Sequence, residues 1–200
     1  MSKRFKFFIG HLSISLFIAL LAIIFVFFVW YPWPLATAVG VTYIFLMLIT
    51  IDVILGPLLG LLVYKEKKKS LKMDLGTIIV VQVIAFSFGF YSIAQGRPAW
   101  IVFNQNSFEL IRVNEIYTEH PESIADKFKK NSWWGPEYVS AQPSTDKNLR
   151  SNDIFAEAIG GISLAQRPER FVELDTQSEK IISTAKPLDQ LKQFNGLDNV

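Results

Sequence analysis

Three long runs of apolar residues dominate the first half of the chain, at about residues 12–30, 38–64 and 75–95. Most charged residues lie outside these runs. Because an α-helix rises about 1.5 Å per residue, each run is long enough to cross a bilayer core about 30 Å thick. The sequence therefore predicts a membrane protein with three transmembrane α-helices over residues 12–95, followed by a small α+β domain over residues 96–200.

The first run has a second interpretation, a cleavable signal peptide. Lys3, Arg4 and Lys6 would form its basic region, and residues 36–38 (Ala-Thr-Ala) resemble a cleavage site. The run is longer than the usual signal core of about 7–15 residues. It also ends in the aromatic stretch of residues 30–33, which suits a membrane–water interface. These features favour a retained membrane anchor.

The second run, from about residue 36 to residue 64, is longer than one crossing needs. Either this helix tilts, or the start of the run belongs to the preceding turn. The run contains Asp52, and Gly56-Pro57 follow about one helical turn later. Since proline removes a backbone donor, we expect a kink there and a freed carbonyl near Val53.

The distribution of Lys and Arg predicts the orientation of the helices. Residues 1–11 carry three basic residues and the loop of residues 65–72 carries five lysines, whereas the link between the first two runs has none. The positive-inside rule places the N-terminus and this loop in the cytoplasm. Three crossings then place residues 96–200 on the opposite side, which is the periplasm in a bacterium. We therefore expect a protein of the bacterial inner membrane.

Residues 96–200 are predicted to form short strands and helices. Partial alternation of apolar residues predicts a hairpin from residues 99–103 and 108–113, with a turn at residues 105–107. A third strand is expected at residues 138–141. Proline, glycine and charge positions predict helices at residues 121–130, 144–159, 178–184 and 187–194, with Asn195-Gly196 ending the last one.

Composition argues against several functional classes. Residues 96–200 hold twelve Lys/Arg against fifteen Asp/Glu, and this acidic balance argues against nucleic-acid binding. The chain lacks cysteine, and its histidines, His11 and His120, lie on opposite predicted sides of the membrane. Glu169 and Glu173 are interpreted as solvated charges, and Gly160-Gly161 lack the rest of a phosphate loop. We expect no enzyme activity, no cofactor and no metal.

Asp52 is a carboxylate deep inside a predicted helix, where a charge is costly enough to suggest a function. One interpretation is contact with a partner helix. A second is an internal role, in which the acid is satisfied by Gln82, Ser87, Thr42 or Thr50. A third, an ion or proton path, is weakened because no second ionisable group lies as deep. The intramembrane candidates for partner binding are Asp52, Gly56, Pro57 and Gln82.

Four further residues are candidates for recognition on the periplasmic side, namely Arg97, Trp100, Trp133 and Trp134. Arg97 and Trp100 follow the third run. They form either an interfacial anchor with a stiff turn, or a fixed linkage that holds the soluble domain beside a partner. Trp133 and Trp134 precede a Gly-Pro turn, where they either bury as core or form a recognition patch.

Several motifs occur in one order along the chain: residues 4–15, 30–32, 51–59, 69–75 and 94–103. They include Ile51-Asp52-Val53-Ile54-Leu55-Gly56-Pro57 and Gly96-Arg97-Pro98-Ala99-Trp100. Together they resemble the type IV pilin accessory proteins of the TfpX/TfpZ family. The similarity covers residues 1–115 and continues more loosely through residues 133–136 and 165–168.

This resemblance implies an inner-membrane protein that assists type IV pilus biogenesis, as a chaperone that binds and stabilises its cognate major pilin before assembly. Its partners would be that pilin, the lipid bilayer and other pilus-assembly membrane proteins. The family offers no catalytic residues to carry over. Two other classes stay open, a membrane-bound pilin-modifying enzyme and a periplasmic sensor with a membrane anchor. The first predicts clustered catalytic residues on the soluble domain and the second a cytoplasmic output domain; neither is apparent in the sequence.

Overall fold

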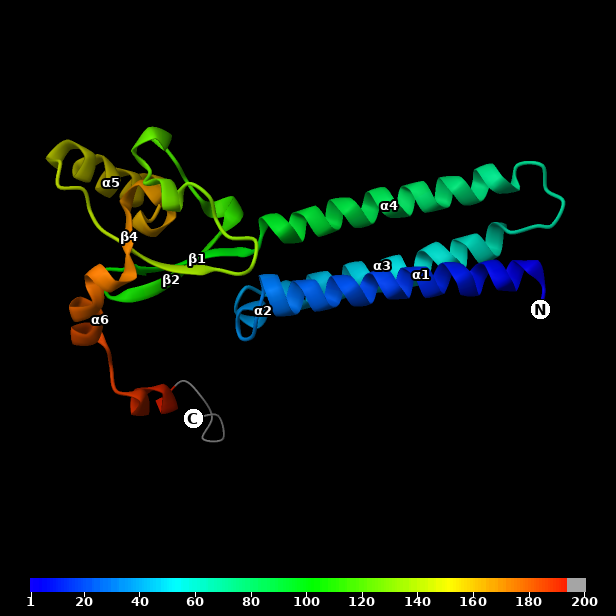
Figure 1. Ribbon diagram of the computed structural model, residues 1–200, viewed down its shortest axis with the longest axis horizontal. Helices are drawn as coiled ribbons and strands as arrows, with labels where there is room; N and C mark the ends of the chain where they lie inside the picture. The colour runs from blue at the N-terminus through cyan, green and yellow to red at the C-terminus, as the bar shows by residue number, and fades with distance from the viewer. Residues whose placement is uncertain (194–200) are drawn as a thin grey trace. The chain divides into compact units, whose positions relative to one another are not determined.

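The computed structural model describes residues 1–193 and divides into two compact units (Figure 1). The first unit contains Met1–Ala99 together with two short segments, Arg112–Asn114 and Ser132–Pro136. The second contains Trp100–Ile111, Glu115–Asn131 and the described chain from Glu137 onward. All three apolar runs therefore belong to the first unit.

Three long helices form the first unit (Figure 1). They are α1 (Lys3–Phe25), which continues into a π-helical turn, η1 (Val26–Trp30), then α3 (Val41–Val63) and α4 (Leu71–Gln95). Each is long and apolar enough to cross a membrane. α1 begins at Lys3, earlier than predicted, because Ser2 Oγ accepts a hydrogen bond from the Phe5 backbone N–H and caps the helix. α3 packs against both α1 and α4.

The second apolar run begins in a connection rather than in a long helix. A short helix, α2 (Leu35–Ala38), is separated from α3 by Gly40, whose positive φ of 71° suits glycine. The start of that run therefore belongs to the turn. α3 continues as one helix through Pro57, and the kink at this residue stays a prediction.

The buried core of the first unit gathers where η1 meets α3 and α4. Val26, Trp30, Tyr31 and Phe45 are almost fully buried. The Tyr31 hydroxyl donates a hydrogen bond of 2.7 Å to the carbonyl oxygen of Ile93 at the end of α4. This bond ties the end of the first spanning segment to the end of the third.

A four-stranded sheet in the order β2-β1-β3-β4 organises the second unit (Figure 1). Its strands are β1 (Pro98–Asn104), β2 (Ser107–Arg112), β3 (Glu137–Ala141) and β4 (Phe171–Glu173). Both strands of the predicted hairpin and the predicted third strand are present. β1 pairs with β3 in parallel and β3 pairs with β4 antiparallel. The short strand β4 was not predicted.

Two helices and several short turns complete the second unit. α5 (Lys147–Gly160) is capped by the Asp146 side chain and ends at Gly161, which has a positive φ of 65°; α6 (Ser178–Thr184) follows later. Short 3-10 segments lie at Val113–Glu115, Pro121–Ser123, Asp126–Phe128, Leu164–Gln166, Pro168–Arg170, Leu174–Gln177 and Leu188–Gln193. The predicted fold class, three membrane helices followed by a small α+β domain, is thus confirmed.

The predicted helix at residues 121–130 is wrong. The chain there forms two 3-10 turns separated by Ile124 and Ala125, whose backbones are extended. Ile124 and Phe128 are both buried, so burial of these two side chains replaces the continuous helix that local propensity favours. The last predicted helix appears as the 3-10 segment Leu188–Gln193, and its expected end at residues 194–196 lies outside the described residues.

Candidate functional site

A cluster of polar side chains joins the three long helices inside the first unit. Gln82 of α4 lies at its centre. Its Nε2 donates to the Asp52 backbone oxygen of α3 at 3.1 Å and to Ser15 Oγ of α1 at 3.2 Å. Its Oε1 lies 3.0 Å from His11 Nε2 of α1. One amide thus bridges all three helices.

These contacts select the tautomer of a neutral His11. The Asp52 carbonyl can only accept, so the NH₂ group of Gln82 must face it and the amide oxygen must face His11. In the neutral imidazole, Nε2 then carries the proton. His11 Nδ1 is left as an acceptor, buried and without a hydrogen-bond partner in residues 1–193.

Two glycines of α3 make room for this cluster. A Cβ atom on Gly56 would lie 1.9 Å from Gln82 Oε1. A Cβ atom on Gly60 would lie 2.9 Å from a ring carbon of Phe7 and 3.5 Å from His11 Nδ1. Small residues at these positions therefore let α1 and α4 side chains approach the α3 backbone, as in close-packed membrane helices.

The Asp52 side chain interacts with Gln82 and also lines two cavities. The larger cavity, of about 380 Å³, lies between α1 and α4, with Asp52 of α3 in its wall. Apart from the four cluster residues its lining is apolar: Ile14, Ile18, Ile79, Val83 and Phe86. A smaller one, of about 170 Å³, lies between α3 and α4. The carboxylate is therefore half-buried and lines two open cavities.

The structure brings together several of the predicted intramembrane candidates. Asp52, Gly56 and Gln82 meet in the cluster, and Pro57 is buried next to them. Thr50 instead donates to the Leu46 carbonyl of its own helix. His11 and Ser15 were missed as cluster members. Their spacing of four residues, continued by Ala19, placed them on one face of α1, and that pattern was the available signal.

A second cluster surrounds Arg97 at the end of α4. Its side chain is only 4% exposed. The guanidinium carbon lies 4.2 Å from the Trp133 ring centre and 5.8 Å from the Trp30 ring centre. Nη1 donates to the Ala94 carbonyl at 2.7 Å. Burial lowers the pKa of Arg97, and the two aromatic faces partly offset the lost hydration.

The tandem tryptophans lie in the first unit and are not core residues. Trp133 is 58% exposed and Trp134 is 78% exposed, so the alternative that they bury as core is wrong. Trp133 packs 6.1 Å from Trp30, and Trp134 packs 6.3 Å from Phe25, between ring centres. Trp100, by contrast, is 1% exposed and packs among the aromatic side chains of the second unit's core.

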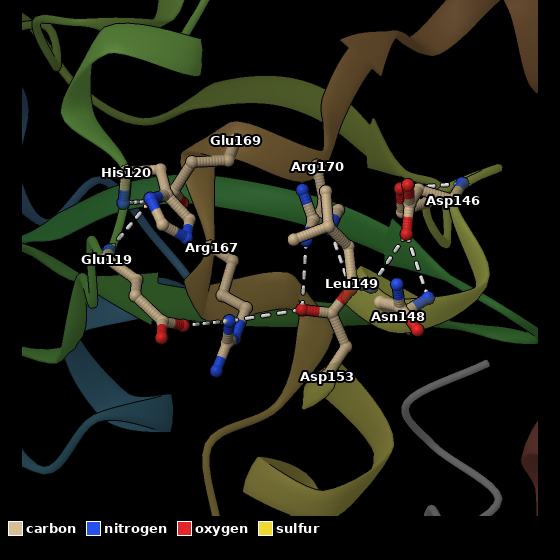
Figure 2. Close-up of polar contacts among 10 residues, drawn as sticks. Glu119, His120, Asp146, Asn148, Leu149, Asp153, Arg167, Glu169 and Arg170 are labelled. Atoms are coloured by element: carbon tan, nitrogen blue, oxygen red, sulfur yellow. Dashed lines mark hydrogen bonds and ion pairs between the residues drawn. The ribbon is translucent and has the colours of Figure 1, made fainter. Parts of the chain in front are cut away.

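A buried ion-pair network holds the second unit together (Figure 2). Asp153 of α5 accepts from Arg167 at 3.0 Å and from Arg170 at 2.6 and 3.1 Å. Arg167 also pairs with Glu119 at 3.2 Å. Asp153 and Arg167 are both almost fully buried. Sequence reasoning did not identify this network, because its members are spread over some fifty positions of the chain.

Glu169 was interpreted as a solvated charge, and this is wrong. Its Oε1 accepts from the backbone N–H groups of Glu119 and His120, at 2.7 and 2.9 Å (Figure 2). Its Oε2 is buried. Glu169 therefore fixes the loop that carries Glu119. Glu173 is exposed and pairs with Lys127.

The Gln82 cluster provides hydrogen-bonding groups, and the Arg97 cluster provides aromatic ring faces. No group of three or more His, Asp or Glu residues that could hold a metal ion is found in residues 1–193. The acidic side chains buried in the second unit are occupied by arginines or backbone donors. Asp52, by contrast, lines an open cavity.

Comparisons with known proteins identify relatives over most of the chain. A family model described as fimbrial assembly protein FimB matches residues 1–40. The fimbrial assembly protein of serogroup E1 from Dichelobacter nodosus is 30% identical over 182 residues, covering 90% of this chain and 70% of that protein. The corresponding protein of serogroups C1 and C2 is 35% identical over 108 residues, covering 53% and 82%. No solved structure matches the chain significantly. On these similarities, the chain belongs to the fimbrial assembly protein family.

Proposed function

We propose that this protein is a chaperone of type IV pilus biogenesis in the bacterial inner membrane, which binds and stabilises its cognate major pilin before assembly. Membership of the fimbrial assembly protein family supports a role in building pili. The motifs shared with the TfpX/TfpZ accessory proteins support the narrower role. The proposal requires binding surfaces and no chemistry.

The observation that carries the proposal is the open, mostly apolar cavity between α1 and α4, which Asp52 lines. A helix bundle that served only as an anchor would gain little from a half-buried carboxylate at an open cavity, because a charge inside the membrane is costly even when it interacts with Gln82. A client helix that reaches Asp52 could give this charge a cationic partner, in addition to Gln82. The apolar walls of the cavity suit a client that is itself embedded in the membrane.

The charge pattern supports a topology that suits a pilin client. By the positive-inside rule, the basic loop of residues 65–72 faces the cytoplasm and the second unit faces the periplasm. The exposed rings of Trp133 and Trp134 would then be available on the periplasmic side to recognise the pilin's soluble part. Arg97 would hold Trp133 in place rather than touch the client itself.

Deletion of the gene, with and without extra copies of the cognate pilin gene, tests the proposal. We expect less pilin in the membrane and fewer surface pili after deletion, and recovery when the full chain is supplied. The tagged protein should co-purify with that pilin from detergent extracts. Normal pilin levels and normal piliation after deletion would overturn the chaperone role. A reporter fused to the C-terminus would test the topology separately.

The competing role of a pilin-modifying enzyme makes a different prediction. Pilin recovered from the deletion strain would then differ in mass from pilin of the parent strain. The chaperone proposal expects an unchanged mass and a lower amount. Mass spectrometry of intact pilin from both strains separates the two.

A further inference from the structure

We propose that the groove between α1 and α4 seats one transmembrane helix of the pilin, and that this helix carries a positively charged group opposite Asp52. The inference rests on the proposed function, because the pilin is the partner it names. It adds the location of the seat and the chemistry of the group that fills it.

Two cavities join to form this groove. The cavity at Asp52 shares Ile18 and Phe86 with a second one, of about 480 Å³, farther along the same two helices. The second cavity is lined by α1, η1 and α4 and is wholly apolar: Ile18, Leu21, Ala22, Ile24, Phe25, Val29, Phe86 and Phe90. α1 and α4 form the walls of both cavities and each pack on α3, which contributes Asp52 to the lining of the first cavity. The side chains of another helix could pack into this concave surface.

The groove has the length of a membrane crossing. Its lining on the first spanning segment extends from His11 to Val29. Eighteen residues of helix at about 1.5 Å each span about 27 Å, close to the bilayer core of about 30 Å. A single helix that crosses the membrane would therefore contact the groove along its whole length.

The charge of Asp52 in the groove selects the occupant. The Asp52 side chain already interacts with Gln82, but no Lys or Arg side chain on the three long helices reaches its depth, and lipid acyl chains provide no cation. Ser15 and Gln82, which meet at the cluster, each lie about fifteen residues, or about 22 Å, from the Trp30 and Arg97 ends of their helices. On α3, however, Asp52 lies eleven residues, or about 17 Å, from each end of the helix, so the carboxylate lies near the middle of the crossing. A cationic group on the client is costly at that depth unless an opposite charge such as Asp52 lies next to it.

A second copy of this chain would not supply the charge. On the three long helices, Lys and Arg occur only near the cluster-side ends, at Lys3, Arg4, Lys6 and Lys72. None of these lies at the depth of Asp52. A partner helix with a basic group at the depth of Asp52 fits the groove better than α1, α3 or α4 would.

Site-specific photo-crosslinking in living cells tests the seat. A photoreactive amino acid is placed at Ile14 or Val83, which line the groove, and at Phe17 or Ile84, which are similarly exposed on the same helices but line neither cavity. The probe is the cognate pilin, detected with an antibody. We expect at least tenfold more pilin adduct from Ile14 and Val83 than from the two control positions.

Other adducts would overturn the inference and leave the proposed function standing. Equal pilin adducts from all four positions would place the client elsewhere on the helices. Adducts only to lipid, or only to a second copy of this chain, would show a different occupant. If piliation still depends on the protein in those strains, only the hypothesis that the groove binds the pilin is rejected. If piliation does not depend on it, the proposed function itself fails.

The charge is tested in the Val83-labelled protein. Asp52→Asn keeps the shape and removes the negative charge, and we expect the pilin adduct to fall at least tenfold. Thr50→Val, a change on the same helix outside both cavities of the groove, should leave the yield unchanged. A wild-type yield from Asp52→Asn would rule out a cationic partner group. If that variant does not accumulate in the membrane, the crosslinks made with Asp52 intact still decide whether the groove is the seat.

Discussion

The side chain of Gln82 occupies the space beside the Gly56 backbone that a methyl group would need. A Cβ atom there would lie 1.9 Å from Gln82 Oε1 and 2.4 Å from its Cδ. The same amide contacts His11, Ser15 and the Asp52 carbonyl. Because Gly56 has no side chain, the Gln82 amide can lie where it links all three helices. This explains why Gly56 follows Asp52 in α3.

Gly56→Ala should therefore destabilise the helical unit. The added methyl forces the Gln82 amide to swing away, and its three bonds between helices, worth about 0.6 kcal/mol each, are lost. We expect a loss of about 1–2 kcal/mol, measured by thermal unfolding in detergent. The matched control is Gly76→Ala, because a Cβ on Gly76 meets nothing within 4 Å. Equal stability of the two variants would contradict this account of Gly56.

Trp133→Ala should cost more stability than Trp134→Ala, although both rings are more than half exposed. Trp133 covers the buried guanidinium of Arg97 at 4.2 Å and packs against Trp30, whereas Trp134 contacts Phe25 alone among the rings. Loss of the cation–π contact and the ring pair is expected to cost about 1–2 kcal/mol. Thermal unfolding of the two variants, followed by circular dichroism, checks the order. A larger loss of stability in Trp134→Ala than in Trp133→Ala would contradict this prediction.

Asp153→Asn should destabilise the second unit strongly. The carboxylate is buried with Arg167 and Arg170, so removing its charge leaves two guanidinium groups without their main partner. Breaking a buried pair from one side costs about 3–5 kcal/mol. Hydrogen exchange across α5 and β4 in the full chain, followed by mass spectrometry, would detect the change as faster exchange.

Asp126→Asn serves as its control, since the Asp126 side chain is 96% exposed and pairs with Lys129 at the surface. The hydrogen bond from Lys129 lowers the pKa of Asp126. Surface pairs of this kind contribute little, so exchange should stay at the wild-type rate. Similar exchange in the Asp153 and Asp126 variants would mean that the buried network does not hold the unit together.

Tyr31 should make the helical unit sensitive to high pH. Burial raises the pKa of Tyr31 from its ordinary value of 10.0 to about 12. A raised pKa means that the folded state favours the neutral phenol. The stabilisation from Tyr31 is therefore fully present below pH 10 and is lost as the pH rises from 10 to about 12.

Tyr31→Phe separates this effect from other alkaline effects. At neutral pH the variant should lose about 1 kcal/mol, because the hydrogen bond to the Ile93 carbonyl is absent. Between pH 10 and 11 it should lose less further stability than the parent does. Tyr91→Phe, which changes a 60% exposed tyrosine, should behave like the parent. Melting temperatures in detergent at pH 7, 10 and 11 provide the measurement.

The sequence alone determined the elements that depend on local pattern. An apolar run of about twenty residues without charges has to form a helix in a bilayer, because only helical hydrogen bonding satisfies its backbone there. The hairpin at β1 and β2 follows from alternation around a polar turn, and α5 begins and ends where an aspartate and a glycine act as caps. In each case the physical cause lies within a few neighbouring residues.

Tertiary structure alone decided which distant residues meet. His11 and Gln82 are 71 positions apart, and Asp153 and Arg167 belong to different elements, so their contacts depend on how helices and strands pack. The same holds for the parallel pairing of β1 with β3 and for the place of Trp133 beside Trp30. Asp52 could be identified as unusual from its hydropathic surroundings. That it shares a hydrogen-bonded group with α1 and α4, and still faces an open groove, follows only from the packing of three helices around one glutamine.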